Sequence, residues 1–245
     1  MIIKQIPNIL TSLNLLTGCI GITLVFSGNY HLASICILLS ALLDYLDGLF
    51  AKLLNAQSSF GKEFDSLSDI VSFGVLPASI IFAYMNNTDY IQSSGSLQLP
   101  AYMAYFTTLF SAIRLAKFNT DKSQQNSFIG LPTPANAILI SSIPLILEYG
   151  VKEHYLYDLI YYVSENYTAL FVLTLISSFL LVSPVRMLSL KFKSYNLITN
   201  RLKYVIILFA IFALTIFGIM AIPIIIIFYI LLSALNMVLK IDKAE

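Results

Sequence analysis

Four aspartates stand close together in the stretch Asp44-Tyr-Leu-Asp47-Gly48-Leu-Phe-Ala51-Lys52, which is followed after eight residues by Gly61-Lys-Glu-Phe-Asp65-Ser-Leu-Ser-Asp69. The chain of 245 residues is otherwise very apolar: it is 58% hydrophobic and 11% charged, with a mean hydropathy of +0.83. Such a composition predicts an integral membrane protein, in which an ionisable side chain is costly and usually functional. The formal net charge of +1 gives no sign of a nucleic-acid-binding surface.

The apolar runs predict an all-α fold, a polytopic membrane helical bundle, because a helix of about 20 residues crosses a bilayer. About eight transmembrane helices fit the sequence. The expected spans are residues 12–28, 31–54, 65–86, 99–119, 132–150, 167–184, 203–219 and 221–240.

A short amphipathic segment, residues 1–13, is predicted to precede these spans and to lie in the membrane interface, since its apolar residues recur at helical spacing. The last two spans are expected to form a hairpin, because a single helix of that length would be far too long. No long hydrophilic stretch divides the chain. We therefore expect residues 1–245 to be one membrane domain, in which the helices of residues 31–86 carry the aspartates.

Lysine and arginine fall almost entirely on one side of the predicted bundle. Thirteen lie on one side and only Lys152 on the other, and positive residues favour the cytosolic side. Both termini and the aspartates are therefore expected to face the cytosol, from the cytoplasmic membrane. The thirteen are Lys4, Lys52, Lys62, Arg114, Lys117, Lys122, Arg186, Lys191, Lys193, Arg201, Lys203, Lys240 and Lys243.

The spacing of the aspartates predicts two helix faces that meet. Asp44 and Asp47 share one face with Gly48 and Ala51, and Asp65 and Asp69 share a second, because residues three, four or seven apart lie on one side of a helix. A polar turn at residues 55–59 would make the two helices antiparallel. Four carboxylates in a low dielectric need protons or cations, and hard divalent ions suit oxygen ligands. We expect two Mg²⁺ or Mn²⁺ ions, a metal site suited to phosphoryl or phosphatidyl transfer.

Single residues in this stretch also allow simpler interpretations. Gly48 and Ala51 leave room for a substrate, but small residues also serve as close contacts between membrane helices. Lys52 could face a phosphate or could extend to the interface from an apolar helix.

The stretch resembles the signature of the CDP-alcohol phosphotransferases, D-x2-D-G-x2-A-R-x8-G-x3-D-x3-D. Every fixed position and gap matches except Lys52, where the family has Arg. The resemblance implies a helical membrane enzyme, usually dimeric, that transfers a phosphatidyl group from a CDP-linked lipid to an alcohol and releases CMP. It also implies roles for single residues. Asp44, Asp47 and Asp65 would be the main metal ligands, Asp69 a ligand or the catalytic base, and Gly48, Ala51, Lys52 and Gly61 the wall for the CDP moiety.

Further passages resemble one branch of that family, the membrane-embedded CDP-diacylglycerol–serine O-phosphatidyltransferases. They are Pro7-Asn8-x2-Thr11-x2-Asn14, Ser72-Phe73-Gly74-Val75-x-Pro77, Arg114-Leu-Ala-Lys117-Phe-Asn119 and Phe128-Ile-Gly130-Leu-Pro132-Thr-Pro134-Ala-Asn136. This resemblance implies CDP-diacylglycerol and L-serine as substrates.

Two groups of residues are expected to complete the substrate site. Asn8 and Thr11 are expected near the cytidine. Arg114, Lys117 and Asn119 could hold an amino-acid acceptor, although Arg114 and Lys117 are equally explained as interfacial cations.

Other functions remain open at this stage. The acceptor could be glycerol 3-phosphate or an inositol phosphate, which would need further cations beside the metals. Membrane carboxylates could also line a divalent-cation transporter, but such a pathway should continue across the bilayer.

Overall fold

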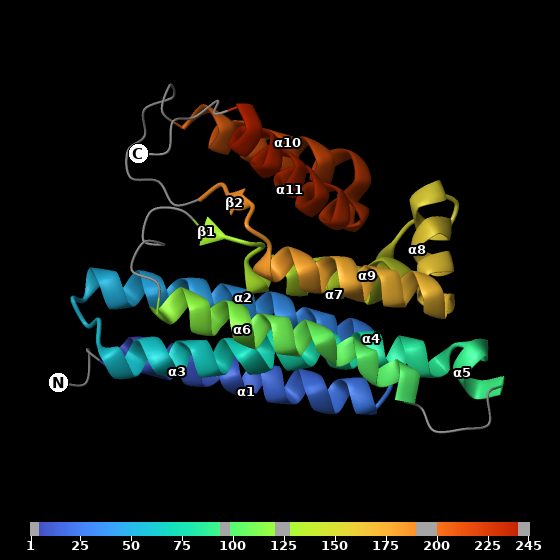
Figure 1. The fold of residues 1–245 in the computed structure, drawn as a ribbon, viewed down its shortest axis with the longest axis horizontal. Coiled ribbons are helices and arrows are strands. Elements are labelled where there is room, and N and C mark those ends of the chain that lie inside the picture. Colours follow the sequence, from blue (N-terminus) through green and yellow to red (C-terminus); the bar gives the residue numbers. More distant parts are fainter. Residues whose placement is uncertain (1–4, 94–98, 121–127, 190–199, 240–245) are drawn as a thin grey trace.

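The computed structural model describes residues 5–93, 99–120, 128–189 and 200–239. These residues are almost entirely helical, and most helices run roughly along the long axis of the molecule (Figure 1). The elements are α1 (Ile6–Phe26), α2 (Tyr30–Leu53), α3 (Ser59–Asp69), the π-helical segment η2 (Ile70–Val75), α4 (Leu76–Asn87), α5 (Asp89–Ser93), the 3₁₀ segment η3 (Leu99–Tyr105), α6 (Phe106–Thr120), β1 (Phe128–Ile129), α7 (Thr133–Tyr149), α8 (Tyr155–Glu165), α9 (Tyr167–Val182), β2 (Arg186–Met187), α10 (Arg201–Phe217), the 3₁₀ segment η5 (Gly218–Met220) and α11 (Ala221–Leu239).

Helix α1 packs along α2 and against α3, η2 and α4. Pro7 stands in its first turn, where a missing N–H costs nothing. No helix breaker separates residues 6–13 from the first predicted span, so this segment forms the first turns of α1 rather than a separate helix. Residues 1–4 of the predicted interfacial segment lie outside the described residues. The buried face of α1 consists of Pro7, Thr11, Asn14, Gly18, Gly21 and Val25.

The third helical stretch, Ser59–Asn87, changes its winding directly after Asp69. In η2 the Leu76 N–H donates to the carbonyl of Val71, five residues back. Pro77 has no N–H with which to continue an α-helical ladder. The Thr108 hydroxyl of α6 donates to the carbonyl of Gly74 in this segment at 3.0 Å. Such π-helical segments are frequent at functional sites.

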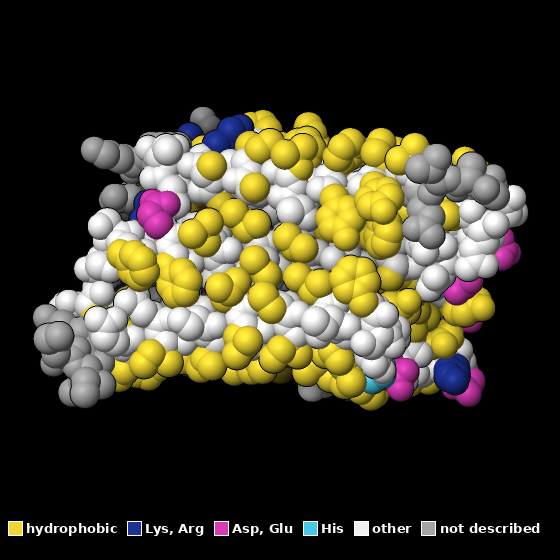
Figure 2. Space-filling model, turned by 90° about the horizontal axis from the view of Figure 1, so that it is seen from below, with side chains coloured by type: hydrophobic (Ala, Val, Ile, Leu, Met, Phe, Trp, Pro, Cys, Tyr) yellow, Lys and Arg dark blue, Asp and Glu magenta, His cyan; other side chains and the backbone are white. Residues whose placement is uncertain are grey.

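The main hydrophobic core lies between α2, η2, α4, α7 and α9. Ile37, Phe73, Ile80 and Ile140 are fully buried there. Outside the core, Figure 2 shows a face with hydrophobic side chains over its middle and charged side chains near its two ends. This distribution fits a molecule whose middle lies in lipid.

Helices α8 and α9 form a sharp corner of 94°. Asn166 stands at the corner, and its side chain accepts a hydrogen bond from the N–H of Ala169 at 3.0 Å, which caps α9. Helix α8 was not predicted from the sequence. Its outer surface carries exposed Tyr155, Tyr161 and Tyr162.

The C-terminal hairpin of α10 and α11 is confirmed. The stretch Arg201–Leu239 has a hydropathy of 3.0 over its most apolar window, and as one straight helix of 39 residues it would measure about 58 Å, nearly twice the hydrocarbon thickness of about 30 Å. Gly218, with φ of 54°, turns the chain instead. The rings of Phe209 and Phe228 then stack at 3.9 Å across the hairpin.

The predicted all-α membrane fold is confirmed at this level. Each of the eight predicted spans coincides with a helical stretch. The predicted and observed ends agree to within a few residues, except that α1 and α3 begin earlier than predicted. Within the described residues, four stretches are long and apolar enough to cross a membrane, or five if α8 and α9 count as one bent span. Of the cations behind the predicted orientation, Lys4, Lys122, Lys191, Lys193, Lys240 and Lys243 lie outside the described residues.

Candidate active site

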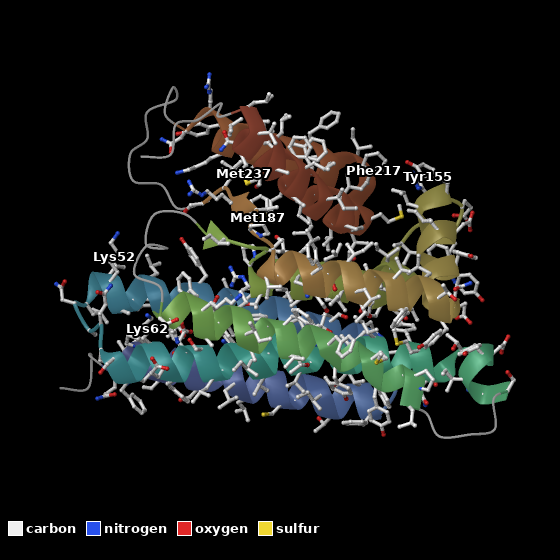
Figure 3. All side chains as sticks on the ribbon, in the orientation of Figure 1. Lys52, Lys62, Tyr155, Met187, Phe217 and Met237 are labelled. Carbon is white, nitrogen blue, oxygen red and sulfur yellow. The ribbon has the colours of Figure 1, made fainter. Side chains whose placement is uncertain are left out.

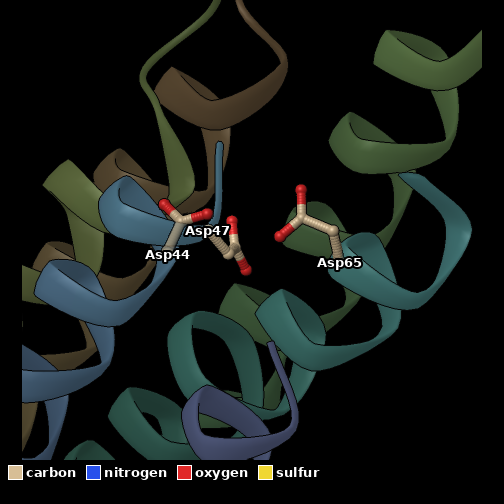
Figure 4. Close-up of side chains that lie close together, drawn as sticks. All are labelled: Asp44, Asp47 and Asp65. Atoms are coloured by element: carbon tan, nitrogen blue, oxygen red, sulfur yellow. The ribbon is translucent and has the colours of Figure 1, made fainter. Parts of the chain in front are cut away.

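Three of the four aspartates come together where α2 faces α3. Asp44 and Asp47 project from α2 toward Asp65 on α3 (Figure 4). One ligand oxygen from each lies within 4.8 Å of the other two. Asp47 is buried, and Asp44 and Asp65 are half-buried. Three carboxylates at such spacing would repel one another strongly without a cation, so the donor set fits a divalent metal ion bound through oxygen.

Asp69 lies one turn beyond Asp65 and turns toward α1. It is 7% exposed, and its Oδ1 accepts from the Asn14 side-chain amide at 3.4 Å. Its carboxylate still senses the charges of the other three aspartates. The structure therefore separates a group of three carboxylates from a fourth, Asp69, which accepts a hydrogen bond from Asn14 of α1.

Helix α1 also contacts the group of three. The Thr11 hydroxyl lies 2.6 Å from Oδ2 of Asp47 and 3.0 Å from the carbonyl of Pro7. Thr11 is only 3% exposed, and its hydroxyl contacts the Asp47 carboxylate. Its predicted contact with the cytidine stays a prediction.

The residues proposed for the CDP moiety have different surroundings. A Cβ added at Gly48 would meet no atom of the described residues within 4 Å. Close helix packing within the described part of the chain therefore does not explain why this position is a glycine. At Gly61 an added Cβ would lie 3.1 Å from the Ser58 hydroxyl and 3.4 Å from Oδ1 of Asn8. Lys52 is exposed near the end of α2, at the same end of the molecule as Lys62 (Figure 3). Ala51 is half-buried one residue before it.

Arg114 on α6 is the most distinctive of the residues proposed for the acceptor. It is 8% exposed, and its Nε is buried without a hydrogen-bond partner. It interacts electrostatically with Asp69 and with the phenol of Tyr229 on α11. A buried cation with an unused Nε–H donor is suited to bind an anionic group.

The other two predicted acceptor residues are placed differently. Lys117 is exposed. Asn119 already packs on α3: its side-chain amide donates to the Ser66 hydroxyl at 2.9 Å, and its carbonyl accepts from Lys62 at 3.2 Å.

Three polar residues around α1 were given no role from the sequence, namely Asn14, Ser40 and Ser72, although Asn14 and Ser72 stand in the passages that resemble the serine branch. Ser40 and Ser72 extend the two carboxylate faces by one turn, and both hydroxyls donate to the Asn14 carbonyl, at 3.4 and 3.0 Å. Their helical spacing from Asp44 and Asp69 was a usable signal. Asn14 itself gave no such signal, because its contact with Asp69 spans 55 residues.

A model of the CDP-alcohol phosphatidyltransferase family matches residues 4–164, and the chain belongs to this family. It is similar to the CDP-diacylglycerol--serine O-phosphatidyltransferase of Helicobacter pylori strain J99, with 40% identity over 136 residues, 55% of this chain and 54% of the relative. It is also similar to the archaetidylserine synthase of Methanothermobacter thermautotrophicus, with 35% identity over 142 residues, 57% of this chain and 58% of that protein. A third relative is the CDP-diacylglycerol--serine O-phosphatidyltransferase of Bacillus subtilis, with 34% identity over 131 residues, 54% of this chain and 70% of the relative. The matched region thus spans little more than half of the first two relatives.

Proposed function

We propose that this protein transfers the phosphatidyl group of CDP-diacylglycerol to the hydroxyl of L-serine and releases CMP. The observation that carries the proposal is the meeting of Asp44, Asp47 and Asp65, whose ligand oxygens all lie within 4.8 Å of one another, inside the region that matches the family. The names of the relatives from Helicobacter pylori and Bacillus subtilis support serine as the acceptor.

The reaction we propose is a single displacement. Asp69 takes the proton of the serine hydroxyl, and the oxygen attacks the phosphorus on the lipid side of the pyrophosphate. A new oxygen–phosphorus bond forms, the bond to CMP breaks, and CMP leaves with that electron pair. Asp44, Asp47 and Asp65, together with Asp69 if it also serves as a ligand, would hold two Mg²⁺ or Mn²⁺ ions. Such ions would neutralise the pyrophosphate and the leaving phosphate.

The chain's other residues would bind and orient the two substrates. Gly48 and Ala51, with Lys52 and Gly61, form the wall proposed for the CDP moiety, and Asn8 lies against Gly61 from the start of α1. Arg114 would bind the serine carboxylate, because it is a buried cation whose Nε has no partner. Lys117 and Asn119 would complete this side of the site at the end of α6.

The proposal includes an arrangement in the membrane. Both termini and the carboxylates would face the cytosol from the cytoplasmic membrane, with about eight spans in one domain, the start of α1 in the interface, and two copies forming a homodimer. The loop charges support this orientation. Lys52 and Lys62 also lie at the end of the molecule opposite Tyr155 and Phe217 (Figure 3).

The test is CMP release by the purified protein in micelles that contain CDP-diacylglycerol, with Mn²⁺ or Mg²⁺ and one acceptor at a time. L-Serine should support release, glycerol 3-phosphate and inositol phosphate should not, and a chelator should stop the reaction. Asp69→Asn should lower kcat about 10²- to 10⁴-fold, the usual contribution of a general base. Release with another acceptor but not with serine would reject the serine assignment. Mn²⁺ uptake into proteoliposomes without CMP release would point to a transporter.

A further inference from the structure

Helix α1 touches both parts of the carboxylate site with buried side chains. Thr11 places its hydroxyl 2.6 Å from Oδ2 of Asp47, closer than its 3.0 Å contact with the carbonyl of Pro7. A hydroxyl has one hydrogen to donate, so the shorter contact to an anionic oxygen is the one it favours. One turn later, Asn14 is fully buried and donates from its amide to Oδ1 of Asp69 at 3.4 Å.

The backbone of α1 is fixed at the same two residues. The Thr11 carbonyl accepts from the Ser68 hydroxyl at 3.2 Å. The Asn14 carbonyl accepts from Ser72 at 3.0 Å and from Ser40 at 3.4 Å. The backbone carbonyl of each residue thus accepts from serines of α2, α3 or η2, and the side chain of each residue donates to a carboxylate.

Asn14 also carries an unmet hydrogen-bonding group. Its Oδ1 is buried without a partner among the described residues. A buried polar atom in this state is destabilising and calls for a functional explanation. The need to present the amide N–H to Asp69 provides that explanation.

We infer that Thr11 and Asn14 are positioning residues with separate tasks: Thr11 orients Asp47 as a metal ligand, and Asn14 holds Asp69 apart from the other three carboxylates as the base. Neither needs to touch a substrate. This inference deepens the proposed function and rests on it for the role of Asp69. The task of Thr11 is independent of which acceptor is used.

The first test measures Mn²⁺ affinity by electron paramagnetic resonance on the full-length protein. Thr11→Val keeps the shape of the side chain and removes the donor, and it should weaken Mn²⁺ binding about 10-fold, the lower range for loss of a group that orients a metal ligand. Thr11→Ser keeps the hydroxyl and should bind Mn²⁺ as the wild type does. The control is Thr17→Val on the same helix, whose hydroxyl donates only to the Leu13 carbonyl at 2.7 Å. Equal Mn²⁺ affinity in Thr11→Val and wild type would overturn the role of Thr11.

The second test concerns Asn14. Asn14→Leu should lower kcat about 10- to 100-fold, because Asp69 loses its orientation, and should leave Mn²⁺ affinity unchanged. Adding Asn14→Leu to Asp69→Asn should lower kcat little further than Asp69→Asn alone does, since the effects of residues that act through one another are not additive. Asn14→Ser, too short to reach Asp69, serves as the second variant if thermal unfolding shows that Asn14→Leu is not folded. If the Asn14 variant weakens Mn²⁺ binding as much as Thr11→Val does, the separation of tasks is wrong.

These outcomes are distinguishable from a failure of the proposed function. A wild type that releases no CMP with any acceptor would end the proposed function and the base role of Asp69. Weaker Mn²⁺ binding in Thr11→Val would still support the role of Thr11.

Discussion

Gly18 of α1 lies directly against Ser72 of η2. A Cβ added at Gly18 would lie 2.5 Å from the Ser72 hydroxyl oxygen, closer than such atoms approach in proteins, and 3.1 Å from the Ser72 Cα, which is tighter than most Cβ contacts. The same Ser72 donates to the carbonyl of Asn14, one turn before Gly18. The absence of a side chain at Gly18 therefore brings α1 within hydrogen-bonding reach of the carboxylates.

We expect Gly18→Ala to destabilise the protein by about 1–3 kcal/mol, the range for overpacking a well-filled interior. Gly48→Ala is the matched control, because Gly48 also lies inside a helix but has no atom within 4 Å of an added Cβ. It should leave the free energy of unfolding unchanged or raise it by up to about 1 kcal/mol, since alanine is the better helix former. Unfolding in detergent, followed by circular dichroism, measures both. Equal losses in the two variants would contradict the close contact at Gly18.

Gly48→Ala also tests the space proposed for the substrate. If the CDP moiety lies against the backbone of α2, a methyl group there should raise KM for CDP-diacylglycerol about 10-fold, equivalent to about 1.4 kcal/mol, while KM for serine stays the same. Steady-state CMP release at varied concentrations of each substrate separates the two effects. Unchanged kinetics in a stable Gly48→Ala protein would show that this space is not used.

Arg114 should determine acceptor affinity. Hydrogen bonds to charged groups contribute about 1.5–3 kcal/mol, so Arg114→Met should raise KM for serine about 10- to 100-fold. Arg114→Lys should recover only part of this, because lysine lacks the forked donors that fit a carboxylate. Lys152→Met is the control, since Lys152 is exposed and lies on the other side of the predicted bundle. A comparable rise in KM for CDP-diacylglycerol would instead place Arg114 at the nucleotide.

Gly130 should be intolerant of any side chain. Its φ is +78°, and an added Cβ would collide with the carbonyl oxygen of Leu181 in the last turn of α9. Gly28 has the same φ of +78° but open space around it. Gly28→Ala therefore measures the backbone strain alone, about 1 kcal/mol. Gly130→Ala should lower the free energy of unfolding clearly more than Gly28→Ala does. A protease-resistance assay or thermal unfolding compares the two variants, and similar losses would rule out the predicted collision.

Local periodicity predicted the helices and part of the site. The spacing of Asp44, Asp47 and Asp65 places them on two helix faces, and the polar turn between the helices brings those faces together, as the structure confirms. Asp69 follows the same spacing but is drawn toward α1 by Asn14. That contact depends on tertiary packing, which no short repeat encodes.

Two other features lay beyond the repeat pattern. Helix α8 was missed because its 11 residues fall below a membrane length, and because His154, which caps its start, is not one of the usual N-cap residues. The depth of Arg114 was not predictable either. Helix α6 packs against η2 and α9, and the phenol of Tyr229 on α11 acts on Arg114 from more than 100 residues away in the sequence.

The π-helical segment η2 acts like a single residue inserted into an otherwise regular helix. If Ile70–Val75 wound as a regular α-helix with the same number of residues, everything before the segment would rotate by about 100° relative to everything after it, the rotation of one residue. The packed half, from Leu76 onward, would keep its buried face, and Asp65 and Asp69 would then point away from α2. The π-helical winding of this segment, and not only the identity of the aspartates, therefore determines whether the part of the helix that carries Asp65 faces α2.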